Sequence, residues 1–189
     1  MKAVTDEQLI QWVADGDPSC LAALFDRHHR AVYHFLLQML KERALCEDLV
    51  QDVFLKVLRK AHNFRGEGSF KGWLFNVARN VALDELRRAS RQGTDPLDDS
   101  ETESALTDHR SAEQEAAGKQ KVKLVLQAMA KLPAAVQEVI WLGRFEFDSY
   151  EELGQALNCN AGTARVRMHR AMDLLKSTYI SMHGVPVDG

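Results

Sequence analysis

The chain of 189 residues is 46% hydrophobic and 27% charged, values typical of globular proteins rather than of disordered chains. No apolar run approaches the ~20 residues that span a bilayer, and the N-terminus lacks the apolar stretch of a signal peptide. We therefore expect a cytoplasmic protein without membrane insertion. The three scattered cysteines form no C-x-x-C pair, and no metal cluster, phosphate-binding glycine loop or nucleophile–base set is visible. The sequence accordingly predicts no cofactor, no bound metal and no enzyme.

Charge is distributed unevenly along the chain. Residues 93–118 contain eight acidic side chains and one basic one, a charge of −7 within a total of −3, which leaves +4 for the rest. The same stretch is rich in serine and threonine and poor in apolar residues, a composition typical of flexible connectors. We expect an acidic linker over residues 92–118 that joins two mildly basic domains. Its first part is expected to be flexible, and the residues from Ser111 onward could already enter the next helix. The alternative is a plain solvated spacer.

Four helices are predicted before the linker, because apolar residues recur there at helical spacing. Thr5 with Gln8 forms a capping box for the first helix, and Ser69 can cap the fourth. Four helices in this length predict a compact helical bundle over residues 1–91. The predicted helices cover about residues 6–14, 18–41, 44–61 and 70–91.

The residues after the linker are predicted to form a helix-turn-helix domain over residues 119–180, with a tail at 181–189. Two helices, about 119–131 and 134–144, come first, and Ser149 can cap a third. Residues 158–160 form a tight turn, because asparagine tolerates left-handed backbone geometry. A last helix follows from Ala161 to Tyr179. The predicted fold class is all-α: two small helical domains, a helical bundle and a helix-turn-helix, joined by the acidic flexible linker.

The predicted fourth helix carries a core face and, beside it, a polar stripe. The stripe combines aromatic, amide, acidic and basic side chains, a set that suits unstacked single-stranded nucleic acid better than a core. Trp73 lies at the border of the two sectors and has two interpretations, a core anchor or a base-stacking residue. The face expected to pack consists of Phe70, Leu74, Val77, Ala78 and Val81. The stripe and its flanking bases are Arg65, Lys71, Trp73, Asn76, Arg79, Asn80, Asp84, Arg87, Arg88 and Arg91.

The last predicted helix has a basic face opposite its packing face. Such a face near a helix N-terminus suits a recognition helix in the major groove, where arginine can read guanine edges or bind phosphate. Val166 stands in the middle of the polar face, where it could meet a thymine methyl group. The alternative is an ordinary basic helix with one exposed valine. The basic face comprises Thr163, Arg165, Val166, Arg167, His169 and Arg170.

Three stretches, in this order, resemble the bacterial sigma factors of the extracytoplasmic-function class, which keep only the second and fourth conserved regions. The resemblance covers nearly the whole chain. It implies an alternative sigma factor that binds core RNA polymerase and directs promoter-specific transcription initiation by reading −35 and −10 elements and melting DNA. It also implies an anti-sigma factor as a partner. The stretches are EDLVQDVFLKV (residues 47–57), FRGEGSFKGWLFNVARNVALDELRR (64–88) and LPAAVQEVIWLGRFEFDSYEELGQALNCNAGTARVRMHRAMDLL (132–175).

The resemblance also implies a role for each group of residues. The implied polymerase-binding residues are Glu47, Asp48, Gln51, Asp52 and Phe54. The implied −10 residues, with the 65–69 loop capturing an extruded base, are Arg65, Ser69, Lys71, Trp73, Asn76, Arg79, Asn80, Asp84, Arg87 and Arg88. The implied −35 residues are Thr163, Arg165, Val166, Arg167, His169 and Arg170.

A second hypothesis is a stand-alone helix-turn-helix regulator of transcription that never contacts polymerase. It accounts for residues 149–176 but leaves residues 47–88 without a role. The promoter-specificity subunit accounts for both stretches, and the sequence therefore favours it.

Overall fold

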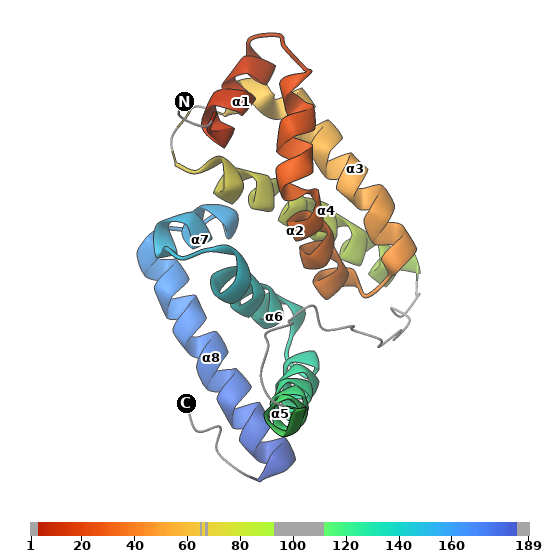
Figure 1. The fold of residues 1–189 in the computed structure, drawn as a ribbon, viewed down its shortest axis with the longest axis vertical. Helices are drawn as coiled ribbons and strands as arrows, with labels where there is room; N and C mark the ends of the chain where they lie inside the picture. The colour runs from red at the N-terminus through yellow and green to blue at the C-terminus, as the bar shows by residue number, and fades with distance from the viewer. Residues whose placement is uncertain (1–3, 65, 67, 93–111, 185–189) are drawn as a thin grey trace.

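The computed structural model describes residues 4–64, 66, 68–92 and 112–184, with the backbone alone at 92 and 112–119. Every regular element in these residues is helical, which confirms the predicted all-α fold class. Figure 1 shows two groups of helices, α1–α4 and α5–α8. The elements are α1 (Asp6–Ala14), α2 (Cys20–Leu40), α3 (Arg43–Lys60), η1 (Ala61–Asn63), α4 (Phe70–Gln92), α5 (Ala112–Ala130), α6 (Ala134–Trp141), η2 (Leu142–Glu146), α7 (Tyr150–Ala156) and α8 (Ala161–His183).

The first group packs around an apolar core whose largest fully buried side chains include Phe35, Phe70 and Phe75. The predicted capping box is confirmed, since Gln8 N donates to Thr5 Oγ1 (3.3 Å) and Thr5 N donates to Gln8 Oε1 (3.0 Å). The second helix begins at Cys20 rather than at residue 18. An Asp17 carboxylate oxygen accepts hydrogen bonds from the Ser19 backbone N–H and hydroxyl, and this local turn delays the helix.

The entry to α4 is held from two sides. Gly72 N donates to Ser69 Oγ (3.1 Å), which confirms Ser69 as the cap of this helix. Phe70 N donates to Glu7 Oε1 (3.0 Å), so α1 supplies a second acceptor to the first turn of α4. The Asp6 carboxylate next to Glu7 pairs with Arg27 and His28 of α2, at 2.6 Å to each. Helix α1 therefore fixes the N-terminus of α4 against α2.

The second group contains the predicted helix-turn-helix. Glu152 N donates to Ser149 Oγ (3.2 Å), so Ser149 caps α7 as predicted. Thr163 N donates to Asn160 Oδ1 (2.8 Å), so a residue of the turn caps α8. Asn158 has a φ of 53°, the left-handed geometry expected in this turn.

The boundaries of three helices in this group differ from prediction. Helix α5 begins at Ala112, within the segment assigned to the linker, which agrees with the alternative start from Ser111 onward. Helix α8 continues to His183, inside the segment assigned to the tail. The predicted helix up to residue 144 is α-helical only to Trp141 and continues as the π-helical turn η2. The remainder of the predicted linker and tail lies outside the described residues.

The two groups of helices pack against each other. Helix α7 contacts α4, and α6 contacts α2 (Figure 1). Gln38 Nε2 on α2 donates to Gln137 Oε1 on α6 (3.0 Å), and the rings of Phe75 and Phe147 meet edge to face at 5.5 Å between centroids. We did not predict this contact, because a flexible linker allows the two groups of helices to lie apart. The contact covers the N-terminal half of the α4 face that carries the predicted DNA-binding residues.

Candidate nucleic-acid and polymerase-binding surfaces

The predicted core face of α4 is buried as expected, which fixes the orientation of the whole helix. Phe70, Leu74, Val77, Ala78 and Val81 are all buried. The half-buried indole of Trp73 packs on the same core, with ring centroids 5.6 Å from Phe64 and 6.1 Å from Phe70. The structure shows the packing contact, and the base-stacking role of Trp73 stays a prediction.

Two cations on the next face of α4 are paired with acids of the second group. Lys71 Nζ lies 3.0 Å from Glu146 Oε2 and donates to the Glu146 backbone carbonyl at 2.6 Å. The ammonium group also lies 5.4 Å from the centroid of the Phe147 ring. About two turns further along, Arg79 forms an ion pair with Glu138, whose side chain is 1% exposed. Both predicted DNA-binding cations are therefore engaged within the chain.

Polar groups at the start and in the middle of this α4 surface bind α7. Asn76 Nδ2 donates to the backbone carbonyl of Ala156 (3.2 Å), and the Ser69 backbone N–H donates to Gln155 Oε1 (3.0 Å). Gly72 permits this approach, because a Cβ atom there would lie 2.7 Å from Gln155 Oε1. Four of the predicted −10 residues, at positions 69, 71, 76 and 79, thus contact the second group of helices.

The C-terminal half of the stripe is open to solvent. Asn80, Asp84, Arg87 and Arg88 are exposed, with short-range ion pairs of Arg87 to Asp84 (3.0 Å) and of Arg88 to a neighbouring glutamate (3.2 Å). Exposed pairs of this kind contribute little stability and leave both partners available. The predicted residue Arg65 lies outside the described residues.

The predicted polymerase-binding face on α3 is exposed, with one correction. Glu47, Asp48, Gln51 and Asp52 all face solvent. Phe54, predicted as a contact residue, is 3% exposed and packs edge to face on Phe25, so its side chain belongs to the core. Leu55, which was not predicted, is 47% exposed beside Gln51 and Asp52. The apolar stripe of α3 includes the buried residues Leu49, Val53 and Val57, and the position of Leu55 outside it was the signal in the sequence.

Helix α8 presents the predicted basic face. Ala164, Met168, Ala171 and Leu175 are buried, and the predicted residues Arg165, Val166, Arg167, His169 and Arg170 are exposed. Thr163 is half-buried at the first turn. The Arg165 guanidinium lies 5.2 Å from the centroid of the Tyr150 ring, and His169 Nε2 lies 3.6 Å from Asp173 Oδ2. The arginine side chains therefore project from one side of the helix, as a groove-reading surface requires.

Sequence reasoning assigned no role to two residues at the interface between the groups of helices, Glu138 and Gln155. Burial raises the pKa of Glu138, and the guanidinium groups of Arg79 and Arg167 oppose that shift. The available signals were a charged residue at a core position of the apolar helix AAVQEVIW and a glycine, Gly72, inside a helix.

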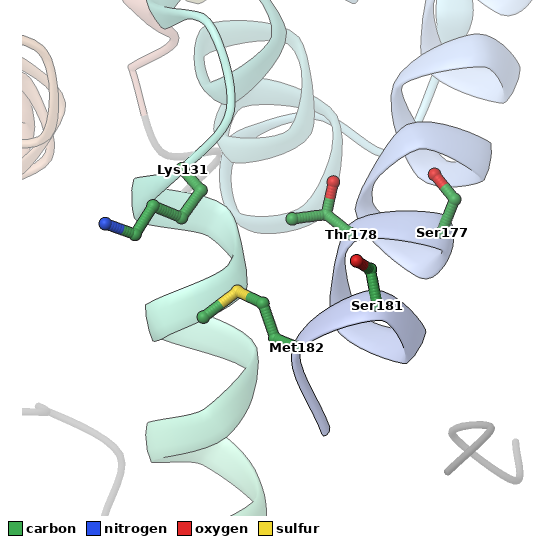
Figure 2. A pocket seen from close by; sticks show the side chains of 5 residues that line it. All are labelled: Lys131, Ser177, Thr178, Ser181 and Met182. Carbon is green, nitrogen blue, oxygen red and sulfur yellow. The ribbon is translucent and has the colours of Figure 1, made fainter. Parts of the chain in front are cut away.

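A pocket lies between the end of α5 and the C-terminal part of α8. Figure 2 shows the residues that line it: Lys131, just after the end of α5, and Ser177, Thr178, Ser181 and Met182 on α8. Within the described ranges no three His, Cys, Asp or Glu residues could together hold a metal ion. In the same part of the chain, no helix is both long and apolar enough to traverse a bilayer.

Comparison with known proteins identifies the family. Sigma-70 region 2 matches residues 24–92, and Sigma-70 region 4 matches residues 123–175. The chain is 31% identical over 169 residues to the RNA polymerase sigma factor CarQ of Myxococcus xanthus. The matched residues cover 86% of this chain and 90% of that protein. It is 29% identical over 182 residues to the ECF RNA polymerase sigma-E factor of Haemophilus influenzae, covering 92% of this chain and 95% of the other.

A solved structure agrees with these matches. The sigma factor RpoE of Bartonella quintana, in complex with the anti-sigma factor NepR, superposes with a TM-score of 0.60 at 26% identity, covering 83% of this chain and 94% of that one. The present chain belongs to the sigma-70 family, in its extracytoplasmic-function class. It is an alternative sigma factor, which directs transcription initiation, and the family is not one of enzymes.

Proposed function

We propose that this sigma factor reads a −10 and a −35 promoter element with separate domains and melts the DNA at the first. Residues 1–91 form the −10 domain, residues 119–180 form the −35 domain, and the acidic residues between them connect the two. The observation that carries this assignment is the polar stripe of α4, which holds amides, acids and bases on one side of a helix anchored by five buried apolar residues.

The −10 strand would bind along this stripe. Asn80 and Asp84 provide hydrogen-bonding groups for base edges, and Arg87 and Arg88 provide positive charge for the backbone. Extruding a base from the stack costs a few kcal/mol, which contacts at the entry of α4 would offset. The 65–69 loop, with Ser69 at its end, stands at that entry. Trp73 packs on Phe64 and Phe70 and so holds α4 in the bundle.

The −35 element would bind the exposed face of α8 as duplex. Arg165 and Arg167 project near the N-terminus of the helix, where a recognition helix meets base edges in the major groove. Val166, 48% exposed between them, gives an apolar contact suited to a thymine methyl group.

Core RNA polymerase would bind the exposed face of α3. The acids Glu47, Asp48 and Asp52 suit a basic partner surface, and Leu55 adds an apolar centre to the patch. Charged groups at such a rim act on association and specificity, while a buried apolar side chain contributes affinity. Phe54 has a structural role beneath this patch.

Two further parts of the proposal rest on the family. An anti-sigma factor holds this sigma factor until it is needed, because a relative of similar fold was solved in complex with one. The protein acts in the cytoplasm, beside the polymerase it serves, and it catalyses no reaction itself.

The test is run-off transcription with core RNA polymerase and the full chain on fragments of the source genome. We expect initiation at a small set of promoters that share a −35 and a −10 sequence. Failure to initiate on any fragment, combined with no binding to core polymerase, would overturn the proposal. Sequence-specific binding to duplex DNA under those same conditions would instead favour a stand-alone helix-turn-helix regulator.

A further inference from the structure

The second group of helices covers the proposed −10 surface with groups that resemble nucleic acid in their chemistry. Glu146 and Glu138 place carboxylates on Lys71 and Arg79, where a bound strand would place phosphates. The backbone carbonyl of Ala156 accepts from the Asn76 amide, as a base acceptor would.

An aromatic ring completes the cover. Phe147 is 6% exposed and lies edge to face on Phe75, with Lys71 Nζ 5.4 Å from its centroid. An aromatic side chain under a cation and against a second ring occupies the kind of place that an unstacked base fills in single-strand complexes. Phosphate, base-edge and base-stacking positions on this half of α4 are therefore all filled from within the chain.

The fit of the cover is close. Gln155 lies directly over α4, and a Cβ atom on Gly72 would lie 3.2 Å from Gln155 Cβ and 2.7 Å from its Oε1. Gly68, with a φ of 91°, allows the same side chain to approach the end of the loop, because a Cβ atom there would lie 2.6 Å from Gln155 Oε1. Both glycines are needed for the closed arrangement.

The other two proposed surfaces stay open in this arrangement. Asp48, Asp52 and Leu55 on α3 are exposed, and so are Arg165 and Arg167 on α8. Figure 1 shows α3 on the side of the first group away from α7. Closure therefore hides one promoter-reading surface and leaves the polymerase-facing and −35 surfaces accessible.

We propose that the α4 surface formed by Ser69, Lys71, Asn76 and Arg79 binds two competing partners, the α6–α7 segment of the same chain and the −10 single strand. The free protein is closed through the first contact, and it reads a −10 element only after the two groups of helices separate. This inference rests on the proposed −10 role of α4. A protein in which the binding-competent state is a minor population binds its ligand more weakly by that fraction.

A disulfide across the interface tests the inference in the full chain. The pair Gly72→Cys with Gln155→Cys places two Cβ atoms near the distance of about 3.5–4.5 Å that a disulfide needs, and removes the amide that would clash. Cys20 and Cys159 are changed to serine to prevent other pairings, while the buried Cys46 is kept. The single variants Gly72→Cys and Gln155→Cys in the same background are the matched controls.

Three measurements are made with the oxidised and the reduced protein: disulfide yield, run-off transcription with core polymerase, and binding to a promoter fragment premelted at −10. We expect the disulfide to form readily in the free protein. Oxidation should lower transcription and premelted-fragment binding by about tenfold or more, with recovery on reduction, because the locked population cannot open. Binding to a −35 duplex should not change. In the single-cysteine controls, oxidation should change neither transcription nor binding to the premelted fragment.

The outcomes separate two kinds of failure. If the disulfide does not form, or if the locked protein transcribes as well as the reduced one, the inference is wrong while the proposed function stands. If the reduced protein and both controls also fail to initiate and fail to bind the premelted fragment, the proposed function is wrong, and the inference is overturned with it.

Discussion

The Arg79 guanidinium on α4 forms an ion pair with the Glu138 carboxylate on α6, and the side chain of Glu138 is 1% exposed. The pair joins a predicted promoter-reading residue to the opposite group of helices. A buried ion pair is not by itself a stabilising feature, since the cost of removing two charges from water can exceed their attraction. The pKa of Glu138 indicates which effect is larger here, because burial raises it more than Arg79 and Arg167 lower it.

The raised pKa of Glu138 predicts that the packing of the two groups of helices, the closed form, depends on pH. A carboxyl whose pKa is higher in the closed form than in an open form favours closure when it is protonated. The closed form should therefore be most populated below the ordinary carboxyl value of 4.5 and should become less stable as pH rises through the raised pKa of Glu138. Small-angle scattering of the free protein should show a larger radius of gyration at neutral pH than in mild acid.

The variant Glu138→Gln should remove most of that dependence and make the closed form, already the main one, more stable at neutral pH. Glutamine has the same shape and can still accept a hydrogen bond from Arg79, but its burial carries no charge penalty. The control is Glu151→Gln, an exposed acid of α7, which should leave the dependence unchanged. An expanded Glu138→Gln protein would show that the ion pair contributes more than burial costs.

Gly72→Ala should weaken the interface from the α4 side. The new methyl group would lie 2.7 Å from Gln155 Oε1 and 3.2 Å from its Cβ, so the Gln155 amide must rotate away from the Ser69 N–H and α7 must shift slightly. Alanine is favoured over glycine by about 1 kcal/mol inside a helix, so α4 itself should become more stable. We expect a larger radius of gyration and an unchanged or higher melting temperature.

Gly162→Ala is the matched control, because that glycine is also helical and its Cβ atom would meet only Asn160 Oδ1, at 3.4 Å. It should gain helix stability without expansion. A compact Gly72→Ala protein would show that Gln155 can give way without separating the groups.

Trp73→Ala should destabilise the first group of helices by about 2–3 kcal/mol, since it removes a partly buried indole from contact with Phe64 and Phe70. Trp73→Phe should retain most of that stability. Thermal unfolding measures the effect. If Trp73→Ala unfolds like the wild type but loses binding to a premelted promoter, the indole reads bases instead.

The double variant Asp48→Ala with Asp52→Ala, and separately Leu55→Ala, should weaken binding to core polymerase without changing the melting temperature. Both changes act on exposed side chains of α3. Glu151→Ala, an acid exposed on α7, serves as the control, and pull-down with core polymerase is the measurement. Unchanged affinity in both test variants would place the docking surface elsewhere.

Arg167→Ala should weaken binding to a −35 duplex by about 1–3 kcal/mol, the size of one bidentate contact to a base. The loss should be smaller on a template premelted at −10, where melting no longer depends on −35 binding. Lys176→Ala tests for a general charge effect, because Lys176 is exposed further along α8. Fluorescence anisotropy with labelled duplexes compares the three proteins, and equal losses on both templates would assign Arg167 another role.

Local signals in the sequence determined the helices and most of the faces. The apolar spacing of α4 fixed which five residues are buried, and the caps at Thr5, Ser69 and Ser149 form as their side chains require. The basic face of α8 followed from the same periodicity, because a helix separates its faces whatever lies around it. The family likewise followed from three stretches of sequence.

Tertiary structure alone decided how the two groups of helices meet. Nothing within AAVQEVIW specifies that Glu138 faces Arg79, since the partner lies on a separate helix on the other side of the linker. Periodicity determines the faces of each helix, but the partner of each face depends on contacts between residues distant in sequence, and here those contacts cover part of the proposed −10 surface.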